Sequence, residues 1–82
     1  MDTLTGMRLF NKVAETGSFS AAGRAIGLAP SSVSRQISAL EEQLGTRLFN
    51  RTTRKLHLTE AGETYHGHTE RIIADIEEAN AA

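Results

Sequence analysis

The apolar residues in the first part of the chain recur at helical spacing. In the first segment they share one helical face, and they stand at Leu4, Met7, Phe10, Val13 and Ala14. This pattern predicts an amphipathic helix over about residues 3–16. Gly17 follows directly, and a glycine at this place is typical of a helix C-terminus.

A second, shorter helix is predicted in the alanine-rich segment that follows. Ser18 or Ser20 can cap its start, Ile26 is its expected apolar anchor, and Gly27 ends it. Another helix start comes almost at once, at Pro30. A short helix, a glycine and a new helix are typical of a helix-turn-helix.

The third helix is expected to run from Pro30 to about Leu44, because proline is tolerated at the first helical position and Gly45 follows as a stop. Its apolar residues fall within a sector about 60° wide, and they are Val33, Ile37, Leu40 and Leu44. Its opposite side is polar and carries Ser31, Arg35, Ser38 and Glu42. One face therefore belongs to a core, and the other is left for function.

The remaining segments predict a hairpin and a long helix. Leu48 is expected to pair with Leu56 and Leu58 across a basic turn, and Thr59 to cap the last helix. Acidic residues in its first turn, Glu60 and Glu63, suit the helix dipole. This helix has an apolar stripe, expected to be a dimer interface, at Tyr65, Ile72, Ile73, Ile76 and Ala79.

Composition restricts what the chain does. Its 82 residues form one small domain, which buries only about 60–65% of its unfolded surface and has no room for a deep enzyme pocket. There is no cysteine, and hence neither a disulfide framework nor a cysteine-ligated zinc site. We find no signal peptide and no apolar run near the ~20 residues that span a bilayer, so we expect a cytoplasmic protein without a membrane partner.

The charge is unevenly distributed, although the net charge is only −1. Residues 17–58 carry six basic side chains against two acidic ones, which gives +4. Residues 59–82 carry one basic side chain against six acidic ones, which gives −5. A basic middle segment followed by an acidic tail favours a nucleic-acid surface in the first part.

The polar face of the third helix suits the major groove of B-DNA. Small hydroxyls at Ser31, Ser32 and Ser34 allow close approach of the backbone, and a helix N-terminus attracts phosphate. The Arg35 guanidinium can donate to O6 and N7 of guanine, and Gln36 on the flank suits adenine or phosphate. Each feature alone also fits plain capping or a solvated surface, whereas their combination in one order is specific to DNA binding.

The hairpin adds basic residues suited to phosphates or a narrow minor groove, namely Arg51, Arg54 and Lys55. An ion pair within the third helix does not explain Arg35, because Glu41 and Glu42 stand at neither i+3 nor i+4 from it.

Residues 17–28, GSFSAAGRAIGL, and 30–62, PSSVSRQISALEEQLGTRLFNRTTRKLHLTEAG, resemble the LysR-type bacterial transcription regulator signature almost throughout. The resemblance implies a mainly α fold, with a winged helix-turn-helix in residues 1–58 and a linker helix in 59–82 that pairs with its twofold mate. It further implies sequence-specific binding of double-stranded DNA by a homodimer at an AT-rich interrupted palindrome.

The resemblance also implies roles for single residues. Recognition-helix contacts are expected at Pro30, Ser31, Ser34, Arg35 and Gln36, and phosphate or minor-groove contacts at Arg51 and Arg54. The family's effector-binding domain, where a small-molecule inducer would bind, is absent from these residues, and no cofactor is expected. Ala29 departs from the Ser or Thr usual before this helix, and an alanine cap costs about 1 kcal/mol.

Two other classes of function were weighed. An enzyme or metal site is disfavoured, because His66 and His68 point about 200° apart on a helix and no nucleophile–base spacing is present. The pairs Glu63–His66 and His66–Glu70 remain open as weak alternatives to a solvated face. A protein-interaction module that docks through the acidic amphipathic helix at residues 60–80 is the principal alternative to DNA binding.

Overall fold

Three short helices are formed as the sequence predicts. The computed structural model describes residues 2–51 and 56–81. In it α1 (Thr3–Thr16) ends at Gly17 and α3 (Pro30–Leu44) ends at Gly45. Both glycines adopt φ near +70°, a left-handed conformation that disfavours other residues. Between them lies α2 (Phe19–Ile26). The hydroxyl of Ser18, directly before it, accepts a hydrogen bond from the Ala21 N–H, so Ser18 is the cap and Ser20 is not.

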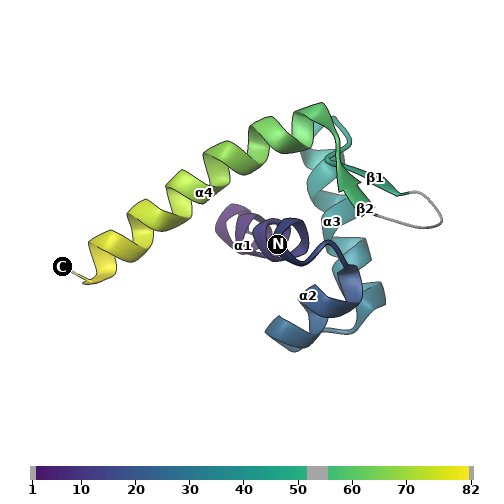
Figure 1. Ribbon diagram of the computed structural model, residues 1–82, viewed down its shortest axis with the longest axis horizontal. Helices are drawn as coiled ribbons and strands as arrows, with labels where there is room; N and C mark the ends of the chain where they lie inside the picture. Colours follow the sequence, from purple (N-terminus) through teal and green to yellow (C-terminus); the bar gives the residue numbers. More distant parts are fainter. Residues whose placement is uncertain (1, 52–55, 82) are drawn as a thin grey trace.

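Helix α1 lies at the centre of the molecule and packs against α2, α3 and α4 (Glu60–Ala81) (Figure 1). The buried apolar side chains come from the first three helices and from the segment that enters the hairpin, and they are Leu9, Phe10, Val13, Ala22, Val33, Ile37, Leu40, Leu48 and Phe49. The Phe10 ring is the centre of this core. It lies 5.3 Å from the Phe49 ring and 5.1 Å from the Tyr65 ring, in tilted and edge-on arrangements that aromatic pairs favour.

Two predicted core residues lie at the surface instead. Ile26, expected to anchor α2, is 43% exposed, and Leu44, expected on the apolar side of α3, is 41% exposed. Each is the last residue of its helix and lines a surface groove instead of the core. Both predictions came from helical periodicity alone, which gives the direction of a side chain but not whether another element covers it.

The hairpin is confirmed, but its register differs from the prediction. Strand β1 (Phe49–Arg51) pairs antiparallel with β2 (Leu56–Leu58), with Phe49 opposite Leu58 and Arg51 opposite Leu56. Leu48 is buried but precedes the strand, so it is not a member of the predicted leucine pairing. Because side chains alternate along a strand, Arg51 shares the face of the buried Phe49.

Helix α4 is fixed to the domain at its beginning and then extends beyond it (Figure 1). The Thr59 hydroxyl accepts a hydrogen bond from the Gly62 N–H and donates one to the Arg47 carbonyl, which confirms the predicted cap. Two turns further on, the buried Thr69 hydroxyl donates to the Asn11 side chain of α1. The three-helix core, the antiparallel hairpin and the long final helix together confirm the mainly α winged helix-turn-helix predicted from the sequence.

Two glycines of α4 should respond oppositely to alanine. A Cβ at Gly62 would collide with the Leu48 carbonyl oxygen, whereas a Cβ at Gly67 meets nothing within 4 Å. We expect Gly62→Ala to lower the free energy of unfolding by about 1–3 kcal/mol through overpacking. Gly67→Ala should raise it by about 0.5–1 kcal/mol, because alanine favours the helix. Urea unfolding of both variants measures the difference, and equal effects would contradict the close approach at Gly62.

Candidate nucleic-acid interface

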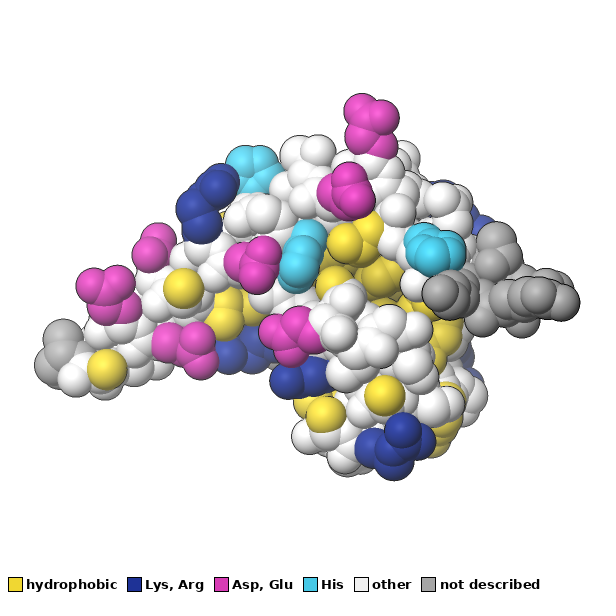
Figure 2. All heavy atoms as spheres, viewed as in Figure 1, with side chains coloured by type: hydrophobic (Ala, Val, Ile, Leu, Met, Phe, Trp, Pro, Cys, Tyr) yellow, Lys and Arg dark blue, Asp and Glu magenta, His cyan; other side chains and the backbone are white. Residues whose placement is uncertain are grey.

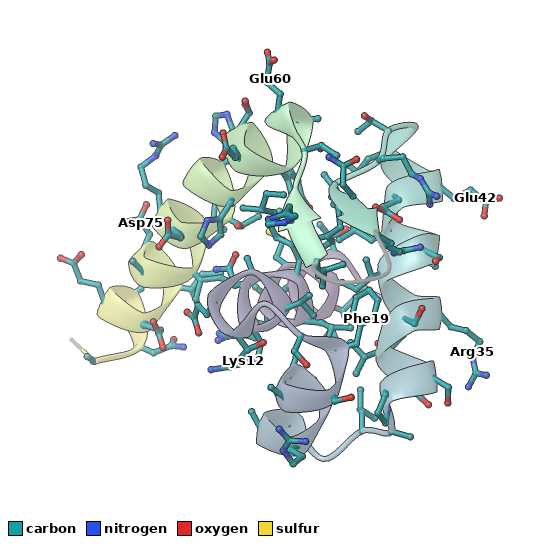
Figure 3. The ribbon with its side chains drawn as sticks, turned by 45° about the vertical axis from the view of Figure 1, so that its right-hand side comes forward. Lys12, Phe19, Arg35, Glu42, Glu60 and Asp75 are labelled. Carbon is teal, nitrogen blue, oxygen red and sulfur yellow. The ribbon has the colours of Figure 1, made fainter. Side chains whose placement is uncertain are left out.

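The outer side of α3 presents the predicted polar face to solvent. Arg35 is exposed and points away from the rest of the domain, on the same side as Glu42 (Figure 3). Its guanidinium donates to the Ser32 hydroxyl over 3.4 Å, a long contact that holds it loosely. Ser31 is exposed beside it. The structure therefore brings an arginine and small hydroxyls together on one unobstructed helix face.

The other predicted residues of α3 lie around this face. Pro30 is exposed at the start of the helix, and Ser34 is half-buried. Gln36 is also half-buried and lines a groove of about 290 Å³ with Thr5, Arg8, Leu9, Ile26 and Leu28. Gln36 thus faces the flank of the helix, as expected from its position.

The start of α3 has no side-chain cap. Ala29 adopts the extended conformation of an N-cap residue, but no side chain accepts a hydrogen bond from the first turn. Backbone N–H groups at a helix start can lack intrahelical partners. In α3 Pro30 has no N–H and the Ser32 N–H donates to the Ala29 carbonyl at 3.0 Å, so the group available to an external acceptor in this turn is the Ser31 N–H.

A buried carboxylate at the other end of α3 was missed by sequence reasoning. Glu41 is only 4% exposed, and one of its oxygens accepts hydrogen bonds from the backbone N–H groups of Leu48 (2.8 Å) and Phe49 (3.2 Å). Its other oxygen faces the guanidinium of Arg51 at 2.8 Å and that of Arg47 at 3.5 Å. One signal was present, since Glu41 lies four residues after the buried Ile37 and thus close to the apolar side of the helix.

Arg51 makes several contacts within its own domain. Its side chain is 26% exposed, pairs with Glu41, donates to the Ser38 hydroxyl over 3.3 Å and lies over the Phe19 ring at 5.4 Å. The cause is the hairpin register, which puts Arg51 on the inner face with Phe49. The other two basic residues predicted in the hairpin, Arg54 and Lys55, lie outside the described residues.

The predicted stripe on α4 divides into two parts. Tyr65 packs edge-on against Phe10 inside its own domain, and this burial raises the pKa of its hydroxyl. Ile73 and Ile76 are half-buried, whereas Ala79 is exposed and Ile72 is 39% exposed. The apolar face is therefore only partly covered by the domain.

A groove of about 350 Å³ lies near the beginning of the same helix. It is lined by Leu44, Thr46, Leu48, Ala61, Thr64, Tyr65 and His68. The exposed Leu44 therefore stands next to the first turns of α4, which leaves additional apolar surface uncovered there.

The acidic charge of the chain lies mainly on α4. Figure 2 shows acidic side chains along α4, whereas Glu42 lies with Arg35 on the outer side of α3 (Figure 3). Within residues 2–51 and 56–81 no three His, Cys, Asp or Glu side chains come together as a metal ion would require. In the same part of the chain no helix is long and apolar enough to cross a membrane.

Comparison with known proteins gives consistent matches. The model of the family described as "Bacterial regulatory helix-turn-helix protein, lysR family" matches residues 4–63. An HTH-type transcriptional regulator of Xanthomonas campestris pv. campestris is 51% identical over 74 residues, which are 90% of this chain and 22% of that protein. The chain thus spans about a quarter of the length of the curated relatives that it matches.

Solved structures agree with these matches. The BenM DNA-binding domain in complex with catB site 1 DNA superimposes with a TM-score of 0.92 at 30% identity, covering 99% of this chain and 89% of that one. The CbnR DNA-binding domain in complex with DNA gives 0.82 at 31% identity and covers 100% of both chains.

The buried carboxylate should dominate the stability of this region. Glu41→Gln leaves the Arg51 guanidinium, whose side chain is 26% exposed, without its carboxylate, so we expect it to lower the free energy of unfolding by about 1–3 kcal/mol. Glu42→Gln makes the same chemical change at the exposed neighbouring position and should stay within about 0.5 kcal/mol of the unaltered chain. Thermal and urea unfolding measure both, and a Glu41→Gln variant as stable as Glu42→Gln would contradict the structural role.

Proposed function

The chain belongs to the LysR family of bacterial regulatory helix-turn-helix proteins, and we propose that it binds double-stranded DNA sequence-specifically to regulate transcription. The observation that carries the proposal is the free outer side of α3, where Arg35 stands beside Ser31 and Ser32 on an exposed helix. Similarity to two DNA-binding domains solved in complex with DNA supports it. In this proposal the chain catalyses no reaction and acts in the cytoplasm, where bacterial DNA lies.

We place α3 in the major groove with Arg35 directed at a guanine, because a guanidinium can donate to both O6 and N7. The proposed base and backbone contacts on this helix are Pro30, Ser31, Ser32, Ser34, Arg35 and Gln36. In the hairpin, Arg54 and Lys55 stay predicted ligands of phosphate or the minor groove. Arg51 instead contacts Glu41 and Ser38 of its own domain.

We further propose a homodimer formed through α4. A helix of 22 residues is about 33 Å long, and the domain covers only part of its apolar face. Ile72, Ala79 and the groove beside Leu44 remain for a second copy. Two DNA-reading domains joined in this way would bind the two halves of a palindrome.

In the proposed arrangement, residues 1–58 form the DNA-reading domain and 59–82 the dimerisation helix. An inducer-binding domain is assigned to the part of the longer relatives that this sequence does not cover.

The alternative is an interaction module that docks through the acidic α4. No observation favours it over DNA binding, and the salt dependence of binding separates the two. A DNA-binding protein should bind random-sequence duplex at low salt and lose affinity steeply as salt rises, because counterions are released from the phosphates. A duplex pool selected by the chain would then yield its preferred sequence, whereas absence of any DNA binding at low salt would favour the interaction module.

Arg35 should determine the preference for one base pair in each half-site. We expect Arg35→Ala to weaken binding to the selected duplex by about 1–3 kcal/mol and to relax the preference at that position. Arg71→Ala, which removes an exposed arginine from α4, is the control and should leave the preference unchanged. Titration against all single-base variants of the selected duplex measures both, and an unchanged profile for Arg35→Ala would mean that this residue reads no base.

Dimerisation should depend on the exposed part of the α4 stripe. Ile72→Glu is expected to give a folded monomer, because a charge cannot be buried between two helices without a partner. Its binding to a full palindrome should lose the advantage of about 10²–10⁴ that tethering gives over a half-site. Ala74→Glu places the same charge at an exposed position about 200° away on the helix and should stay dimeric. Sedimentation and titrations on full and half sites decide, and a wild-type monomer that still prefers the palindrome would refute the proposal.

A further inference from the structure

We propose that the ion pair between Glu41 and Arg51 positions the hairpin relative to α3 for DNA binding, so that Arg51 is a positioning residue and binds no phosphate. This inference rests on the proposed DNA-binding function and assigns a role within it. Helix α3 and the hairpin are the two elements expected to contact DNA. Their relative position therefore affects whether both can bind the same duplex at once.

The contacts of Arg51 join three elements. Its guanidinium lies 2.8 Å from the Glu41 carboxylate and 3.3 Å from the Ser38 hydroxyl, both on α3. It also lies over the ring of Phe19 on α2, which points into the space between α2, α3 and the hairpin (Figure 3). A side chain held in three directions has little freedom to reach outward to a phosphate.

Glu41 completes the connection from the helix side. The oxygen that does not face Arg51 accepts hydrogen bonds from the N–H groups of Leu48 and Phe49. One carboxylate therefore binds both the backbone at the start of β1 and the side chain of Arg51 at its end. Within the described residues, every side-chain hydrogen bond between α3 and residues 47–51 ends on Glu41 or Ser38.

Electrostatics also argues against a phosphate ligand. The charge of Arg51 is already compensated by a carboxylate that is 4% exposed. Moving the guanidinium to a phosphate would leave that carboxylate without its closest cation, which is costly for a buried charge. The pair thus adds no net positive charge to the DNA surface. Its proposed effect on DNA binding is to fix the position of the hairpin relative to α3.

The test compares Glu41→Gln, Arg51→Met and the double variant, which has the net charge of the unaltered chain. Methionine keeps an unbranched apolar chain over Phe19, and glutamine keeps an oxygen for the two backbone N–H groups. Affinity for the selected duplex and its salt dependence are measured at a temperature where circular dichroism shows each variant folded. Glu42→Gln and Arg71→Met serve as controls, because they make the same charge changes at exposed positions outside this ion pair.

If the pair positions the hairpin, both single variants bind the duplex more weakly, on the order of tenfold, although one removes a negative and the other a positive charge. The double variant recovers to within about threefold of the unaltered chain, because an ion pair replaced as a unit leaves no buried charge unpaired. Its salt slope is also unchanged, because no phosphate contact is lost.

Two results would overturn the inference. One is a Glu41→Gln variant that binds more tightly while Arg51→Met binds more weakly, as charge alone dictates. The other is a double variant that stays weak with its salt slope reduced by about 0.9, the loss expected for one neutralised phosphate. Should a single variant fail to fold, the double variant compared with the unaltered chain still decides between these outcomes. An unaltered chain that binds no DNA refutes the proposed function instead, and this is visible before any variant is made.

Discussion

The carboxylate of Glu41 is the constraint on which the arrangement of this small domain depends. A charged group that is 4% exposed is stable only when its oxygens are hydrogen-bonded or paired, and here the partners are two backbone N–H groups and the Arg51 guanidinium. Satisfying it requires the chain after α3 to turn back along the helix and enter β1 at a fixed place. The hairpin therefore has a defined position relative to α3, although it consists of two strands of three residues each.

Both apolar contacts and buried hydrogen bonds hold the elements of the domain together. Phe10 brings α1, the hairpin and α4 together through its contacts with Phe49 and Tyr65. The buried hydrogen bond between Thr69 and Asn11 then fixes α4 against α1. These contacts all lie on the inner side, whereas on the polar side of α3 Ser38 contacts Arg51 and Arg35 stays exposed. The exposed Arg35 is therefore available for the DNA contact that we propose.

The apolar face of α4 lies in two environments, since its first half packs against the domain and its second half is partly exposed to solvent. Its first half completes the core of the domain through Gly62, Tyr65 and Thr69. Its second half extends beyond the three-helix body and keeps Ile72 partly in solvent, among acidic side chains that suit a helix surrounded by water (Figures 1 and 2). A partner surface for this half would bury apolar area that the domain itself is too small to cover.

Local signals in the sequence determined the helices, their ends and the class of the protein. Apolar spacing, glycine stops and the caps Ser18 and Thr59 act within a few residues, so they can be read without knowing the fold. Tertiary structure decided three things that involve distant residues. It left Ile26 and Leu44 exposed, it turned Arg51 inward through the register of the hairpin, and it buried Glu41 against backbone groups seven and eight residues away. Periodicity describes only the direction in which a side chain leaves its own element, whereas what that side chain meets depends on where the other elements lie.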